Sequence, residues 1–130
     1  MPFPTIESFI AAAEAQLGVR FPDAFRTYLI ASNGGEIDAA DESRLIHPVF
    51  DDSDRKRAAR SASHIVYETR QARSWAGFPA QGVAFASNGS GDHLAFLPDP
   101  GDTQRLGSVV FLWQHETRAL TQVAEAFDEL

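Results

Sequence analysis

The order of periodic segments predicts a single α+β domain in which helices pack on a mainly antiparallel sheet. Two segments with helical spacing open the chain, a hairpin pattern lies near residues 83–97, and an unbroken apolar run occupies 109–113. We expect one domain over residues 1–130, because no linker interrupts the pattern and 130 residues suit one core. Ten phenylalanines and two tryptophans can fill that core.

The first two segments predict a pair of short helices. Thr5 can cap the first helix, whose apolar stripe runs to Leu17 and stops at Gly18. Pro22 is suited to the first turn of the second helix, which ends at Asn33-Gly34-Gly35. We therefore expect a helical hairpin or an angled pair of helices before residue 36.

Residues 44–75 predict a strand followed by one helix. The stretch from Arg44 to Phe50 has β-branched and aromatic content, but Pro48 cannot donate to a ladder, which indicates an edge strand. Ser53 or Asp54 can then cap a helix that continues to about residue 75.

The segment 83–97 predicts a hairpin around Asn88-Gly89-Ser90-Gly91. A four-residue loop pairs Ser87 with Asp92, Phe85 with Leu94 and Val83 with Phe96. One face of the hairpin is then bulky. The other face carries mostly small residues, which allow a helix to approach it closely. These residues are Ala84, Ala86, His93, Ala95 and Leu97.

The remainder predicts a loop, a strand and a last helix. Residues 98–107 are rich in turn formers, and the apolar run 109–113 is typical of a central strand buried on both faces. Val123, Ala126, Phe127 and Leu130 form the apolar stripe of the final helix.

The composition excludes several classes of protein. The absence of cysteine excludes disulfides, thiolate metal sites and cysteine nucleophiles. No secretion signal and no apolar stretch of bilayer length is visible, so we expect a cytoplasmic protein without a membrane partner. The formal charge of −7 disfavours nucleic acid as a partner. Acids dominate residues 1–54, whereas residues 55–75 are basic. We interpret the basic run as a solvent-exposed helix face in preference to a nucleic-acid binding patch.

No motif for catalysis or for a metal or cofactor is found. The four histidines lack the spacing of a helical zinc pair, and 51–54 lacks the glycine and glutamate of a calcium loop. Ser90, Asp92 and His93 occur together, but neighbours on a strand point to opposite faces and cannot easily converge. The glycine-rich turns lack the lysine of a P-loop. We expect no catalytic residue, cofactor or metal.

Four blocks, in order along the chain, resemble the SUKH superfamily, which includes the Smi/Knr regulators. The first comprises Leu17-Gly18, Phe21-Pro22, Tyr28-Leu29 and Asn33-Gly34-Gly35, with Phe21 in place of the commoner leucine. The others are Phe85-Ala86 with Gly89-Ser90-Gly91-Asp92, then 110–116, and the Ala-x-x-Phe-x-x-Leu stripe of 124–130. Residues 36–81 match no block.

This resemblance implies helices on an antiparallel sheet, no cofactor and no reaction. Bacterial members are thought to be immunity proteins that neutralise polymorphic toxins such as nucleases, and eukaryotic members resemble scaffold proteins. The shared blocks are expected to be structural, and their central residues are Pro22, Asn33, Gly34, Gly35, Gly91, Asp92, Trp113, His115 and Glu116.

We therefore hypothesise a non-enzymatic immunity protein that covers a basic toxin domain by direct contact. Complementary charge favours such a contact. The expected contact residues are acids in a stretch with few local countercharges: Glu36, Asp38, Asp41, Glu42, Asp51, Asp52 and Asp54. A regulatory scaffold for a host protein is the first alternative. An uncharacterised enzyme using Asp92, His93, His115 or Glu116 is the second, and a pocket gathering those side chains would favour it. The oligomeric state is not predicted.

Overall fold

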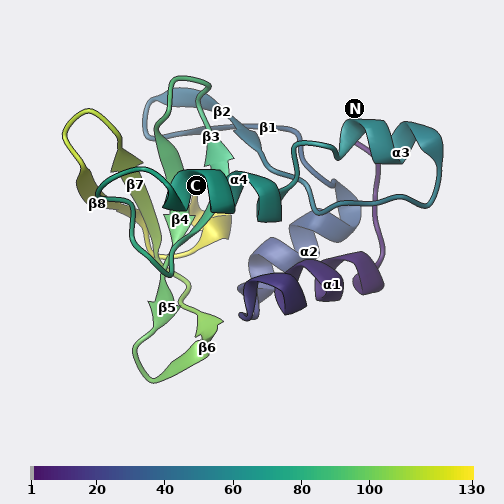
Figure 1. Ribbon diagram of the computed structural model, residues 1–130, viewed down its shortest axis with the longest axis horizontal. Helices are drawn as coiled ribbons and strands as arrows, with labels where there is room; N and C mark the ends of the chain where they lie inside the picture. The colour runs from purple at the N-terminus through teal and green to yellow at the C-terminus, as the bar shows by residue number, and fades with distance from the viewer. Residues whose placement is uncertain (1) are drawn as a thin grey trace.

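The computed structural model describes residues 2–130, in which helices lie against one curled antiparallel sheet (Figure 1). The sheet has six strands in the order β1-β2-β3-β4-β7-β8, and β5 pairs separately with β6. The helices are α1 (Glu7–Leu17), α2 (Asp23–Ala31), α3 (Arg55–Arg60) and α4 (Ile65–Arg73), with a 3₁₀ turn, η1, at Phe127–Glu129. The strands are β1 (Glu36–Ala39), β2 (Glu42–Ile46), β3 (Val83–Ser87), β4 (His93–Phe96), β5 (Pro98–Asp99), β6 (Asp102–Leu106), β7 (Val110–Gln114) and β8 (Ala119–Ala124). The α+β prediction is confirmed.

The first helical pair forms where the sequence predicts it. Gly18 ends α1 in the left-handed conformation (φ 72°), which glycine adopts without strain, and Pro22 precedes α2. The predicted cap at Thr5 is wrong, because Ile6 occupies the cap position without a side-chain bond. Thr5 instead donates its hydroxyl to Asp51 at 2.8 Å and so ties the N-terminal segment to the loop before α3.

A buried arginine joins α1 to α2. Arg26 contacts the carboxylates of Glu7 and Glu14, with its Nε 3.0 Å from Glu14 Oε2. Glu14 also accepts the backbone N–H of Phe21 at 2.7 Å. These two carboxylates raise the pKa of the Arg26 guanidinium, and they satisfy a charge that would be costly to bury alone.

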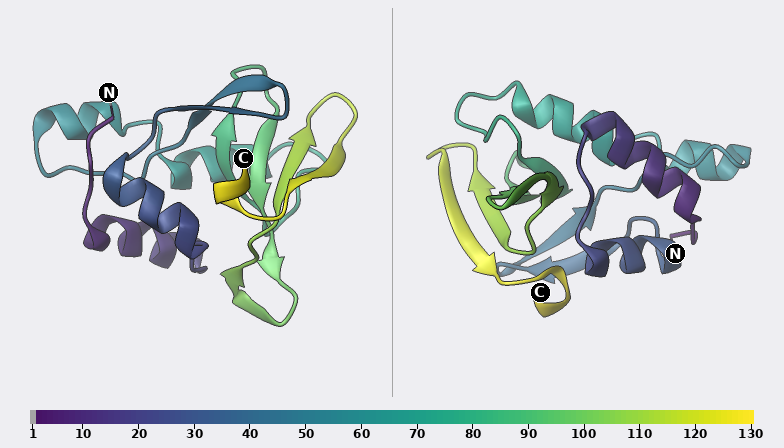
Figure 2. Two further views of the ribbon diagram at one scale, coloured as in Figure 1. Left: turned by 180° about the vertical axis from the view of Figure 1, so that it is seen from behind. Right: turned by 90° about the horizontal axis from the view of Figure 1, so that it is seen from below.

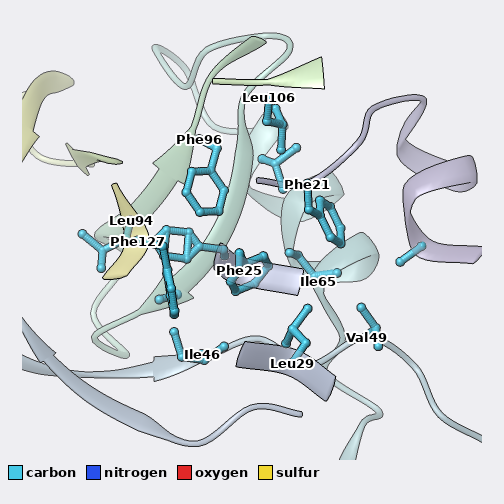
Figure 3. Close-up of a cluster of buried hydrophobic side chains, with 14 of the residues drawn as sticks. Phe21, Phe25, Leu29, Ile46, Val49, Ile65, Leu94, Phe96, Leu106 and Phe127 are labelled. Carbon is cyan, nitrogen blue, oxygen red and sulfur yellow. The ribbon is translucent and has the colours of Figure 1, made fainter. Parts of the chain in front are cut away.

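Phenylalanine rings fill the core between the helices and the sheet (Figure 3). Phe25 of α2 lies 5.4 Å from the rings of both Phe85 and Phe96, measured between centroids. Phe85 and Phe96 stack on each other at 4.3 Å. Phe127 from the C-terminal turn closes the cluster 5.2 Å from Phe25. Segments from both ends of the chain therefore meet in one core.

The β3–β4 hairpin forms as predicted, but its register differs. Val83 pairs with Phe96 as expected, whereas a bulge at Phe85 pairs Ala86 with Leu94 and moves Ser87 opposite His93. The bulge turns both Phe85 and Ala86 toward the main core, so Ala86 does not belong to the small face. The remaining small residues keep their predicted role: Ala84 and Ala95 pack against Ala72 of α4.

The edge-strand prediction for residues 44–50 is wrong. An unpredicted strand, β1, forms the edge, and β2 lies between β1 and β3. The β1–β2 turn contains Ala40 and Asp41 at φ 53° and 65°, a conformation whose usual glycine signal is absent from the sequence. Pro48 follows β2 and leaves its pairing intact.

The long helix predicted after Asp54 is two helices. Asp54 caps α3, as predicted, by accepting the N–H of Arg57 at 2.8 Å. The chain then breaks where the buried Ser61 hydroxyl donates to the carbonyl of Arg57 at 2.7 Å and accepts the Asp51 N–H. His64 starts α4 by accepting the N–H of Tyr67 at its Nδ1.

The C-terminal predictions need correction. Residues 98–107 form the small β5–β6 hairpin instead of a loop. β7 lies inside the sheet, but Phe111 and Leu112 are only half-buried. The predicted final helix is wrong, because β8 pairs with β7 after a turn at Arg118 (φ 59°), and only three residues form the 3₁₀ turn.

Candidate functional site

The seven acids predicted to form one patch lie in two places. Glu36, Asp38, Asp41 and Glu42 lie on the β1–β2 hairpin, whereas residues 51–54 lie at the start of α3. Figures 1 and 2 place that hairpin and α3 at opposite ends of the molecule. The predicted patch therefore does not form a single surface.

The acids beside α3 are mainly structural. Asp51 is only 3% exposed and accepts hydrogen bonds from Thr5 and Ser53. Burial acts to raise the pKa of Asp51, but these hydrogen bonds outweigh burial and hold the pKa below its usual value. Asp54 caps α3 and pairs with Arg57. Asp52 is exposed, and no hydrogen bond or ion pair of its side chain is found among the described residues. The expectation of few local countercharges is wrong here.

Three of the four acids of the β1–β2 hairpin border an open hollow of about 550 Å³, and Glu36 does not line it. Asp38, Asp41 and Glu42 line it together with Glu129, which comes from the C-terminal 3₁₀ turn. Among the described residues that line the hollow there is no lysine or arginine. Glu129 could not be predicted from the sequence, because it lies 87 positions after Glu42 in the chain. We call Asp38, Asp41, Glu42 and Glu129 the acidic hollow.

A buried arginine supports this hairpin from beneath. Arg44 is 1% exposed, donates its Nε to the carbonyl of Ala39 at 2.9 Å, and places one nitrogen 3.0 Å from Glu42. Glu42 also accepts from Asn88 in the β3–β4 turn at 3.1 Å. Glu42 is therefore partly compensated, whereas no contact of the Asp38 or Asp41 side chain with another charged residue is found among the described residues.

The residues of the Asn-Gly-Gly block are structural. The Asn33 side chain donates to the carbonyl of Val49 and accepts its N–H, both at 2.9 Å. Gly34 accepts the Tyr28 hydroxyl at 2.6 Å. Gly35 has φ 93°, and a Cβ there would lie 2.9 Å from Pro2. This block joins the end of α2 to the segment that follows β2.

The Gly-Asp and His-Glu blocks meet in a second structural contact. Asp92 Oδ1 accepts the backbone N–H of His115 at 3.0 Å and lies 2.8 Å from its Nδ1. Burial acts to raise the pKa of Asp92, but the hydrogen bonds from His115 outweigh it and lower the pKa. A Cβ at Gly91 would lie 3.0 Å from the His115 ring, which accounts for glycine there. This contact ties the β3–β4 turn to the end of β7.

The side chains of the enzyme alternative do not converge in one pocket. Asp92 contacts His115, but Glu116 is exposed. Ser90, which the sequence places near Asp92, bonds to Asn88 and to no other side chain among the described residues. His93 is buried on the sheet against Trp113, with 6.2 Å between ring centroids. Trp113 is core, as predicted, and donates its indole N–H to Gly77 at 3.2 Å.

We expect Asp92→Ala to lower the free energy of unfolding by about 1–3 kcal/mol, because it leaves the His115 amide and ring without their acceptor. Urea unfolding measures the effect. Glu116→Ala is the matched control, since Glu116 is an exposed acid one residue from His115. Equal stability of the two variants would contradict the structural role of Asp92.

A groove lies between α4 and the strands β2, β3 and β4, with a volume of about 440 Å³. We call it the α4 groove, and its principal lining residues are Leu45, His47, Glu68, Trp75, Ser87 and His93. Burial lowers the pKa of His47 to about 3, and it also lowers the pKa of His93. Burial raises the pKa of Glu68. The groove could not be predicted from the sequence, because its residues come from four separate elements and the loops beside them.

The fold is that of a small single α+β domain. Residues 4–130 match the SMI1/KNR4 family (SUKH-1), and the chain therefore belongs to this family. No curated protein gives a significant match. Within residues 2–130, none of the helices has the length and apolar character needed to cross a membrane.

Proposed function

We propose that this protein is a cytoplasmic, non-enzymatic immunity protein that neutralises a toxin by direct contact. Membership of the SUKH family supports this role, since its bacterial members are commonly immunity proteins. The partner is a basic protein domain, and a nuclease would present such a surface to bind its own polyanionic substrate.

The acidic hollow is the observation that carries the proposal. Four carboxylates from two distant parts of the chain gather around one concave surface, and no cation lines it among the described residues. A field of one sign attracts a partner of opposite sign and raises the rate of association. The proposed contact surface thus differs from the seven acids expected from the sequence, and it consists of Asp38, Asp41, Glu42 and Glu129.

The experiment is co-expression with the product of the adjacent gene, followed by pull-down and by growth rescue. We expect a stoichiometric complex and restored growth. A complex with a host protein and no protection from a neighbouring toxin would favour the scaffold alternative.

We expect the variant Asp38→Lys, Asp41→Asn, Glu129→Lys to associate with the partner about 10–100 times more slowly at low salt, because complementary charge raises association rates. Asn is used at residue 41 because it tolerates the positive φ there. Glu42 is left unchanged because it contacts the buried Arg44. Stopped-flow kinetics measures the rate.

The matched control is Asp23→Asn, Asp52→Lys, Glu116→Lys, which changes the net charge equally at exposed residues that do not line the acidic hollow. This control should retain an association rate within about threefold of the wild type. Equal slowing of both triple variants would mean that net charge, and not the acidic hollow, governs association.

A further inference from the structure

The α4 groove offers acceptors and no positive charge. Glu68 of α4 and the rings of His47 and His93 are the ionisable groups among its described lining residues, and none of those residues is lysine or arginine. Because burial lowers the pKa of both histidines, their rings are neutral at pH 7. Each neutral ring keeps one nitrogen with a free lone pair.

Two ring nitrogens at this groove have no hydrogen-bond partner among the described residues: His47 Nε2 and His93 Nδ1. Both histidines are only 7% exposed, and their ring centroids lie 6.2 Å apart. Buried polar atoms are rarely left unpaired, so these two nitrogens indicate a partner that the free chain does not supply.

Trp75 and Glu68 define the charge of that partner. Trp75 lies at the rim with half of its surface exposed, and an indole face attracts a cation. No ion pair or hydrogen bond of the Glu68 carboxylate is found among the described residues, and burial raises its pKa. A cationic donor would supply both the hydrogen bonds and the charge.

We propose that the α4 groove receives an arginine side chain of the protein partner. The guanidinium donates to the Glu68 carboxylate and packs on Trp75, and the rings of His47 and His93 turn their buried nitrogens toward it as it binds. Arginine suits the groove better than lysine, because its planar group carries five donors and stacks on aromatic rings. Only the origin of this arginine rests on the proposed function.

The groove adjoins the acidic surface through the β3–β4 turn. Asn88 of that turn donates to Glu42 of the acidic hollow, and its neighbours Gly89 and Gly91 line the groove. Because α4 and η1 lie on opposite sides of the sheet (Figure 2), a partner that occupies both the α4 groove and the acidic hollow extends around the β3–β4 turn.

An NMR titration with N-acetyl-L-arginine amide tests the proposal without the partner. We expect millimolar binding, as is usual for an isolated side chain, with a shift of the Trp75 indole N–H. The backbone amide of Gly101, in the turn between β5 and β6 and outside the groove, is the internal reference. Glu68→Gln should weaken binding about tenfold through loss of a charge-assisted pair, whereas the control Glu125→Gln should not. Circular dichroism verifies that both variants are folded.

Two further ligands make the result decisive. The citrulline analogue has the same shape without the charge, and equal binding of that analogue would overturn the cation site. Binding of free L-arginine at least about tenfold more tightly than the amide would indicate a small-molecule site and overturn the docking role. The acidic-hollow variant should leave the titration unchanged, so failure of the proposed function and failure of this inference remain distinguishable.

Discussion

The free energy of unfolding should fall by about 2 kcal/mol between pH 7 and pH 5 through His47 alone. In the folded protein burial lowers the pKa of His47 to about 3, whereas the unfolded value is near 6.5. The unfolded chain therefore binds a proton below pH 6.5 that the folded chain does not bind until about pH 3. Stability is lost as the pH falls through this window. His93 acts in the same direction, since burial also lowers its pKa.

The variant His47→Phe isolates this effect. Its free energy of unfolding should depend clearly less on pH between 7 and 5. At pH 7 the variant should be at least as stable as the wild type, because an unpaired buried nitrogen is removed. Urea unfolding at several pH values measures both quantities. His64→Asn, which retains a capping acceptor on a half-buried residue, should change the slope little. An unchanged slope in His47→Phe would contradict the account.

Asn33→Ala should lower the free energy of unfolding by about 2–4 kcal/mol, because it removes two hydrogen bonds and leaves a buried donor and acceptor unpaired. The orphaned groups are the N–H and the carbonyl of Val49, a fully buried residue. No other described side chain bonds to them, and the junction between α2 and the segment after β2 would loosen.

Asn88→Ala is the matched control for Asn33→Ala, since Asn88 also precedes a glycine but makes its hydrogen bonds at the surface. Its cost should stay within about 0.5 kcal/mol. Chemical unfolding of both variants gives the comparison. If Asn33→Ala lowers the free energy of unfolding as little as Asn88→Ala does, the junction between α2 and the segment after β2 does not depend on the Asn33 side chain.

Local signals in the sequence predicted the parts of the fold that local chemistry decides. Gly18, Pro22 and Asp54 mark helix ends through their own backbone preferences or side-chain bonds, and all three do so in the structure. The β3–β4 hairpin follows from its glycine-rich turn. The burial of Trp113 follows from its place in an apolar run.

The errors arose where distant segments decide the outcome. Val123, Ala126, Phe127 and Leu130 suit a helix by spacing, but pairing with β7 holds the first of them in β8. The helix after Asp54 breaks because Ser61 bonds to Asp51, ten residues earlier. The bulge at Phe85 forms because its ring fits against Phe25 and Phe96. The spacing of residues along the chain gives no information about these contacts.

The candidate site was predicted in part for the same reason. The hairpin acids were found by their density, whereas Asp51 became buried through its contact with Thr5, 46 residues away. Glu129 joins the hollow through the fold of the C-terminus, and the α4 groove combines four elements. The sequence therefore predicted the type of surface more accurately than its members.

The most direct test of the central claim is the dependence of the association rate on ionic strength, measured by stopped-flow mixing with the basic partner. If the acidic hollow steers binding, the logarithm of the rate should fall steeply between low and physiological salt, because the Debye length shortens. The slope should be much smaller for Asp38→Lys, Asp41→Asn, Glu129→Lys. A rate that is independent of salt, or an equal slope in that variant, would contradict the account.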